Sequence, residues 1–160
     1  MSKVLIVAEH LNGQLNAATA RCVTCARELK AEAIDVLVLS NAPDDVAVQA
    51  AKLEGVSKVL TSARAESAHP LAALLAPQIA AVAKNGYTHL LLPSTTFGKD
   101  VAPRAAALLG VGQVSDIMAV NGAHAFTRPV YAGNAIVDVE VPNDAIVVGT
   151  VRTASWPAAG

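Results

Sequence analysis

Aromatic side chains are scarce in this sequence. Phe, Tyr and Trp make up 3% of the 160 residues, whereas apolar residues of all kinds make up 53%. The core therefore has to be built from Ala, Val, Leu and Ile, and the chain is long enough for one domain with a large core. No apolar run approaches the roughly 20 residues that a membrane-spanning helix needs, so we expect no membrane insertion.

An excess of charge of one sign is missing as well. The formal net charge is -1 and the basic residues form no stripe, so we expect no nucleic-acid partner. Residues 1–3 lead straight into an apolar segment and leave no room for a secretory leader, which predicts an intracellular protein.

Cysteine is limited to Cys22 and Cys25, too few for a disulfide framework. Their spacing resembles a redox pair, but they fall in the middle of a predicted helix, on its apolar face, and not at a helix start. We expect both to be buried packing residues. A zinc site would need two more ligands at suitable spacing, so we expect no metal.

Motifs for cofactor binding and catalysis are also missing. The one glycine pair with suitable spacing, Gly110 and Gly112, follows a helix and does not link a strand to a helix, so it is no dinucleotide fingerprint. No Ser or Cys stands in a nucleophile elbow, no two carboxylates share a helix face, and the four histidines are scattered. We therefore predict no catalytic residue, no cofactor-binding residue and no enzyme activity in this chain.

Apolar periodicity is what the first two thirds of the chain provide. Short β-branched runs alternate with segments of helical period, which predicts a parallel sheet with helices on both faces. The predicted strands are 4–8, 34–39, 56–60 and 88–92, and the predicted helices are 17–31, 45–53, 71–84 and 100–109.

The pattern changes after Gly112. Short strands separated by turn residues follow one another without helices, which predicts antiparallel hairpins. The predicted strands are 114–120, 127–131, 135–141 and 145–151. The fold class is therefore α/β, with a mostly parallel sheet extended by antiparallel C-terminal strands.

Residues 93–104 form the turn and helix start after the strand 88–92. The segment TTFGKD (95–100) resembles a phosphate loop, but Asp100 stands where that loop needs Ser or Thr, and its charge would repel phosphate. We instead expect Asp100 to cap the helix and Pro103 to lie in its first turn. Lys99 and Arg104 could attract an anion, or Arg104 could pair with Asp100.

The segment RPVYAGNA (128–135) combines a rare aromatic residue with turn residues. Gly133 and Asn134 tolerate a positive φ, which predicts a tight bend between strands. A corner of the sheet and an interface around Tyr131 are both compatible with this pattern.

Several segments together resemble one known family, the N-terminal domain of the electron transfer flavoprotein alpha subunit. They are VLIVAEH (4–10), YTHLLLPSTTFGKDVAPRAAALL (87–109), SDI (115–117), RPVYAGNAI (128–136) and VRTASW (151–156). The departures are Pro129 and the segment 154–156. The residues that we expect to form an interface or a structural motif are Phe97, Gly98, Lys99, Asp100, Arg104, Arg128, Tyr131, Gly133, Asn134 and Arg152.

The resemblance implies a Rossmann-like three-layer sandwich of the adenine nucleotide alpha hydrolase type, over residues 1–152. Residues 153–160 would be a linker toward an FAD-binding domain that is absent from this chain. The family is a heterodimer with a beta subunit, and it carries electrons from acyl-CoA and other dehydrogenases to a quinone oxidoreductase. The chain alone would then hold no FAD and act as a scaffold.

The resemblance also implies a location, the cytoplasm in bacteria and the mitochondrial matrix in eukaryotes. Two other functions stay open from the residues themselves. One is a stand-alone adenine-nucleotide-binding module of universal-stress-protein type, and the other is a small α/β enzyme.

Overall fold

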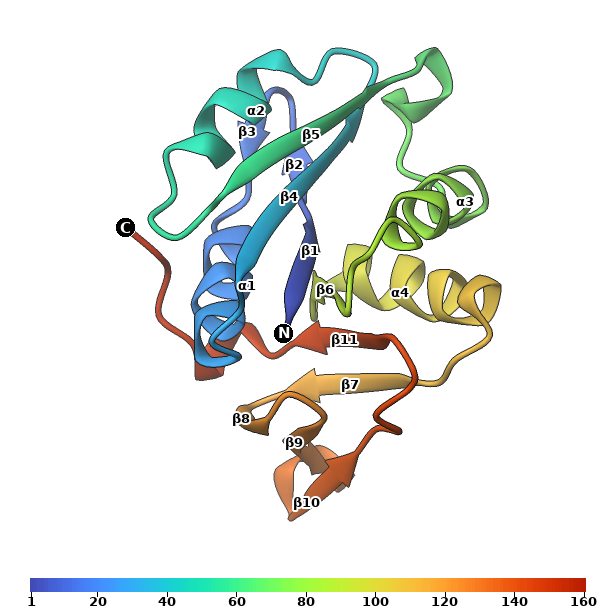
Figure 1. Cartoon of the computed structure of the whole chain (residues 1–160). Helices are drawn as coiled ribbons and strands as arrows, with labels where there is room; N and C mark the ends of the chain where they lie inside the picture. The colour runs from blue at the N-terminus through green and yellow to red at the C-terminus, as the bar shows by residue number, and fades with distance from the viewer.

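The computed structural model describes residues 1–160, and its centre is one six-stranded sheet (Figure 1). All five strand pairings in this sheet are parallel, which confirms the predicted fold class. In spatial order the strands are β5 (Lys58–Ala63), β4 (Ala33–Ser40), β1 (Lys3–Val7), β6 (His89–Pro93), β11 (Val147–Val151) and β7 (Gln113–Ile117).

Two helices cover each face of the sheet, as the alternating sequence pattern predicts. The helices are α1 (Ala17–Glu28) and α2 (Asp44–Ala51) on one face, and α3 (Ala72–Ala83) and α4 (Thr96–Leu109) on the other (Figure 1). Asn16 is the N-cap of α1, because its side chain accepts a hydrogen bond from the Ala18 N–H at 2.8 Å. None of the helices has the length and apolar character needed to cross a bilayer.

A small antiparallel sheet lies beside β7, at the other end of the main sheet from β5 (Figure 1). Its strands are β8 (Ala119–Gly122), β9 (Ala125–Val130) and β10 (Ala135–Glu140). The chain turns out of β7 at Met118, whose N–H donates to the Thr127 carbonyl at 2.9 Å, so the predicted strand 114–120 is divided in two. Phe126 of β9 is fully buried and joins this sheet to the core under α1.

The last strand corrects one prediction. Residues 145–151 were expected to return antiparallel beside 135–141, but β11 lies in the main sheet and pairs in parallel with both β6 and β7. All five residues of β11 are buried. A strand covered on both faces has a continuous apolar run, and VVGTV fits this pattern better than that of a half-exposed hairpin strand.

Smaller differences concern the connections and the bounds of one strand. The turn after β1 contains a short hairpin of β2 (His10–Leu11) and β3 (Gln14–Leu15). The strand predicted at 56–60 is β5, which ends at Ala63. Single-turn 3₁₀ helices occur at Ala65–Ala68, Tyr131–Gly133 and Thr153–Ser155. Because all strands of the main sheet are parallel, their carboxyl ends lie at one edge, where ligands and partners of such sheets usually bind.

Candidate functional sites at the carboxyl edge of the sheet

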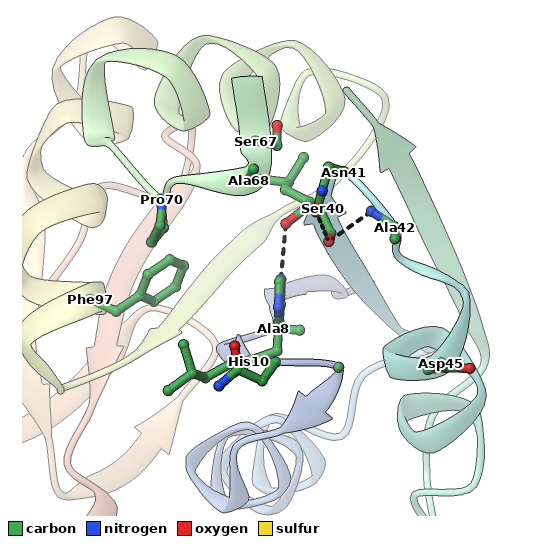
Figure 2. A pocket seen from close by; sticks show the side chains of 14 residues that line it. Ala8, His10, Ser40, Asn41, Ala42, Asp45, Ser67, Ala68, Pro70 and Phe97 are labelled. Atoms are coloured by element: carbon green, nitrogen blue, oxygen red, sulfur yellow. Dashed lines mark hydrogen bonds between the residues drawn. The ribbon is translucent and has the colours of Figure 1, made fainter. Parts of the chain in front are cut away.

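A first cavity opens where β1 and β4 end (Figure 2). Its volume is about 290 Å³, at the lower limit for a site that encloses a small molecule. It lies close to the point where the strand order reverses. The chain adds β4 and β5 on one side of β1, and β6 and the later strands lie on the other side. We call it the β1–β4 cavity, and its polar lining comes from His10, Asn12, Ser40, Asn41, Asp45 and Ser67.

The β1–β4 cavity lacks a cation. No Lys or Arg lines it, and its one carboxylate comes from Asp45. His10 is held at the cavity wall because its Nε2 contacts the Leu39 carbonyl at 2.9 Å. Ser40 is occupied as well, since its hydroxyl accepts from the Ala42 N–H at 3.1 Å. The cavity therefore offers no Lys or Arg side chain that could bind a phosphate through a charge-assisted hydrogen bond.

A carboxylate of this chain, that of Glu9, lies at the turn from β6 into α4. Thr95 is the N-cap of α4, and its hydroxyl accepts from the Gly98 N–H at 3.3 Å and donates to Glu9 Oε2 at 3.1 Å. The Glu9 carboxylate therefore lies at the positive end of α4, where other proteins with this arrangement bind phosphate. Glu9 was not among the predicted site residues, and the phosphate-repelling role that the sequence suggested for Asp100 fits Glu9 better.

The helix start corrects the role of Asp100. Helix α4 begins at Thr96, so Asp100 and Pro103 lie inside the helix and not at its cap or in its first turn. The N-cap is instead Thr95, five residues earlier, and its hydroxyl accepts the backbone hydrogen bond that we expected Asp100 to accept. Lys99, Asp100 and Arg104 are exposed on the helix surface, and the predicted Asp100–Arg104 ion pair does not form.

Phe97 and Gly98 have different roles at this turn. Phe97 lines the β1–β4 cavity (Figure 2). Gly98 is buried against the end of β6, where a Cβ atom would lie 1.6 Å from the Pro93 carbonyl oxygen. Only glycine permits this close approach of helix and strand.

A second cavity lies at the carboxyl ends of β7 and β11, on the same edge of the sheet. Its volume is about 510 Å³, and we call it the arginine cavity. Its lining residues include Asp116, Arg128, Tyr131, Gly133 and Arg152. Four of the ten predicted site residues thus come together here from separate segments, and Asn134 follows directly after Gly133.

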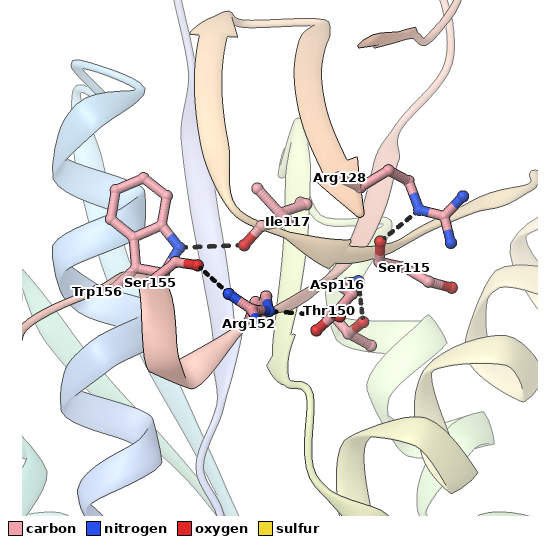
Figure 3. Close-up of polar contacts among 8 residues, drawn as sticks. All are labelled: Ser115, Asp116, Ile117, Arg128, Thr150, Arg152, Ser155 and Trp156. Atoms are coloured by element: carbon pink, nitrogen blue, oxygen red, sulfur yellow. Dashed lines mark hydrogen bonds and ion pairs between the residues drawn. The ribbon is translucent and has the colours of Figure 1, made fainter. Parts of the chain in front are cut away.

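Polar contacts fix the arginine cavity (Figure 3). Arg128 of β9 donates from Nε to the Ser115 carbonyl at 2.7 Å. Arg152 lies with its Nε 3.8 Å from Asp116 Oδ2 and donates from Nη1 to the Ser155 hydroxyl at 3.1 Å. The Asp116 N–H donates to the Thr150 hydroxyl at 2.8 Å, which joins β7 to β11.

The backbone around the arginine cavity is unusual. Asp116, Tyr131 and Ala132 have φ values of 62°, 50° and 54°, and Gly133 has 88°. The left-handed region costs an L-residue about 1–2 kcal/mol. The predicted bend is present, and of the two residues that tolerate a positive φ, Gly133 adopts it whereas Asn134 has φ -71°. Tyr131 is 81% exposed at the tip of this bend.

Residues after β11 pack onto the domain. Trp156 is buried, and its indole N–H donates to the Ile117 carbonyl at 3.1 Å. Arg21 of α1 donates to the Thr153 and Trp156 carbonyls, and the Ala159 N–H donates to the Ala20 carbonyl. The hydrogen bond from Trp156 to Ile117 holds the end of β7 beside the arginine cavity (Figure 3).

The thiols and the buried histidine lie apart from both cavities. Cys22 and Cys25 are buried on α1 as free thiols, as predicted. Burial raises the pKa of Cys25 to about 12 and also raises the pKa of Cys22, so neither is a thiolate near neutral pH. His89 is fully buried in β6, and this burial lowers its pKa.

Sequence reasoning missed several residues of these sites. Asp116 belongs to the segment SDI (115–117), and Glu9 and His10 belong to VLIVAEH (4–10), but none of the three was predicted as a site residue. Their one signal was position, because polar residues that follow a buried strand gather at one edge of a parallel sheet.

Comparison with known proteins gives one consistent result. The family model described as "Electron transfer flavoprotein domain" matches residues 4–160. The electron transfer flavoprotein subunit alpha of Pseudomonas aeruginosa is 47% identical over 155 residues, which cover 97% of this chain and 49% of that protein. The corresponding subunit of Paracoccus denitrificans is 44% identical over 158 residues, 98% of this chain and 50% of that protein.

A mitochondrial relative extends the comparison to eukaryotes. The mitochondrial electron transfer flavoprotein subunit alpha of Dictyostelium discoideum is 40% identical over 164 residues, which cover 99% of this chain and 46% of that protein. The chain thus spans about half the length of these curated relatives.

Proposed function

Because the chain belongs to the electron transfer flavoprotein domain family, we propose that it is the N-terminal domain of an alpha subunit and acts as a scaffold in the heterodimer. The observation that carries this proposal is the family match over residues 4–160, together with 44% to 47% identity to bacterial alpha subunits. In this proposal the domain packs against a beta subunit and supports a flavin-binding domain that lies outside these 160 residues.

The proposed heterodimer carries electrons on FAD. It accepts them from acyl-CoA or other dehydrogenases and delivers them to a quinone oxidoreductase, and this chain contributes no catalytic group to either step. Such a protein works in the cytoplasm of bacteria or the mitochondrial matrix of eukaryotes. Two features support a scaffold without a nucleotide of its own. The β1–β4 cavity has no cationic lining, and the Glu9 carboxylate occupies the N-terminal end of α4.

The proposed domain boundary follows β11. Residues 1–152 form the α/β unit, and residues 153–160 lead toward the flavin-binding domain. Their packing through Trp156 gives this segment a fixed start, so the following domain would hold a defined orientation.

Flavin content tests the scaffold role. We expect the purified chain to contain no stoichiometric FAD, and the alpha subunit of which it is a part to acquire one FAD on co-expression with the beta subunit. Absorbance at flavin wavelengths after denaturation gives the stoichiometry. One flavin for each purified chain would contradict the proposal. Calorimetric titration with AMP separates this function from a nucleotide-binding module, since micromolar binding would favour the module.

A further inference from the structure

We propose that the arginine cavity is a docking site for an acidic side chain of the beta subunit, with Arg128 as the charged contact and Tyr131 as the apolar one. The identity of the partner rests on the proposed function. The site itself rests on the charges, the hydrogen bonds and the exposure of the residues around the cavity.

Arg128 is the uncompensated charge in this region. Asp116 is the one carboxylate that lines the cavity, and it lies beside Arg152 at 3.8 Å. Arg128 has no ion pair, and its single hydrogen bond, from Nε to the Ser115 carbonyl, fixes the guanidinium plane. Both terminal nitrogens are then left without a partner in this chain, with the spacing that binds a carboxylate through two parallel hydrogen bonds.

Tyr131 supplies the apolar half of the site. Tyr131 is 81% exposed, and its backbone lies in the left-handed region with φ 50°. Pro129 and Val130 add apolar surface to the same cavity. Tyr and Arg are enriched among the residues that dominate protein interfaces, and a small anion could occupy Arg128 but would leave Tyr131 uncovered. The combination therefore favours a protein surface that presents Asp or Glu beside an apolar side chain.

The test measures binding of the beta subunit to this domain. The alpha subunit that contains the domain is titrated with the beta subunit, and Arg128→Glu is compared with Arg64→Glu, which makes the same charge change at an exposed position after β5, at the other end of the sheet from the arginine cavity. We expect Arg128→Glu to weaken binding at least about tenfold, and Arg64→Glu to change it by less than about twofold. Arg128→Lys, which keeps the charge but loses the two-point geometry, should lie between them.

A second variant covers the case in which Arg128→Glu disturbs the fold through the Ser115 contact. Tyr131→Ala removes an exposed ring and should leave the melting temperature nearly unchanged, yet weaken binding about fivefold. If the unmodified subunits do not associate, the proposed function fails and the docking site with it. If they associate and both variants bind as Arg64→Glu does, the proposed function stands and the docking site is wrong.

The remaining outcome concerns small anions. If inorganic phosphate binds the free chain and Arg128→Glu abolishes that binding without affecting the beta subunit, the cavity is an anion site and the docking proposal is overturned.

Discussion

The β1–β4 cavity and the arginine cavity lie on the same edge of one parallel sheet, and they differ in charge. The first has a carboxylate and no cation among its lining residues, whereas the second has two arginines and one carboxylate. Ligands of such folds usually bind near the point where the strand order reverses, and the first cavity lies close to it. The chemistry that attracts an anion or a partner has instead gathered at the second.

The difference has a cause in the turns. At the first region the Glu9 carboxylate already lies at the positively polarised N-terminus of α4, where it accepts a hydrogen bond from the Thr95 hydroxyl. At the second region the connection between β7 and β11 contains no α-helix, so its charges come from side chains on β9 and after β11. Position in the fold therefore shows where a site can form, and local charge decides what it can bind.

The largest effect should come from breaking the turn that closes the first region. Gly98→Ala places a Cβ atom 1.6 Å from the Pro93 carbonyl oxygen, so either α4 or β6 has to move. We expect a loss of at least about 3 kcal/mol in the free energy of unfolding, measured by urea denaturation. Gly112→Ala is the matched control, since nothing lies within 4 Å of its Cβ position. Equal stability of the two variants would show that the turn is not as tight as described.

A smaller effect is expected at the loop between β8 and β9, which lies apart from both cavities. His89 of β6 holds the loop before β9, because its Nε2 contacts the Ala123 carbonyl, and the His124 ring lies 5.8 Å away. Burial lowers the pKa of His89, so the unfolded chain binds a proton more readily than the folded one. Stability due to this residue is then complete above the unfolded pKa of about 6.5 and falls as the pH drops below it.

The pH effect can be measured as a difference between variants. Below about pH 6.5 the loss due to one histidine is at most about 1.4 kcal/mol for each pH unit, followed by the urea midpoint. His89→Gln should reduce this loss, whereas His69→Gln, at an exposed position, should keep it. An unchanged pH dependence in His89→Gln would assign the acid sensitivity to other groups.

The sequence predicts much of the fold and little of the site. Alternating strands and helices gave the parallel sheet and its layers, because periodicity reports local burial. The place of β11 was missed because short strands and turns precede it without helices, although its own sequence fits a central strand better than a hairpin strand. Its insertion between β6 and β7 depends on which neighbours cover it.

The arginine cavity shows the same limit for function. Arg128 and Arg152 were both singled out by family resemblance, but their common environment with Asp116 results from the β7–β11 pairing. Glu9 had no motif of its own, and its role depends on the distance of its carboxylate from a hydroxyl 86 residues later in the chain. Contacts between distant segments are the part that local patterns do not contain.

The smallest predicted effect distinguishes the observed helix start from the one that the sequence suggested. Thr95→Ala removes the cap of α4 and its link to Glu9, and should cost about 1 kcal/mol in the free energy of unfolding. Thr95→Ser keeps the hydroxyl and should restore most of this loss. Asp100→Ala, at an exposed site inside the helix, should change stability by less than about 0.5 kcal/mol. If Asp100→Ala lowers stability more than Thr95→Ala, the helix starts at Asp100. The carboxylate at the N-terminus of α4 would then be that of Asp100 and not that of Glu9.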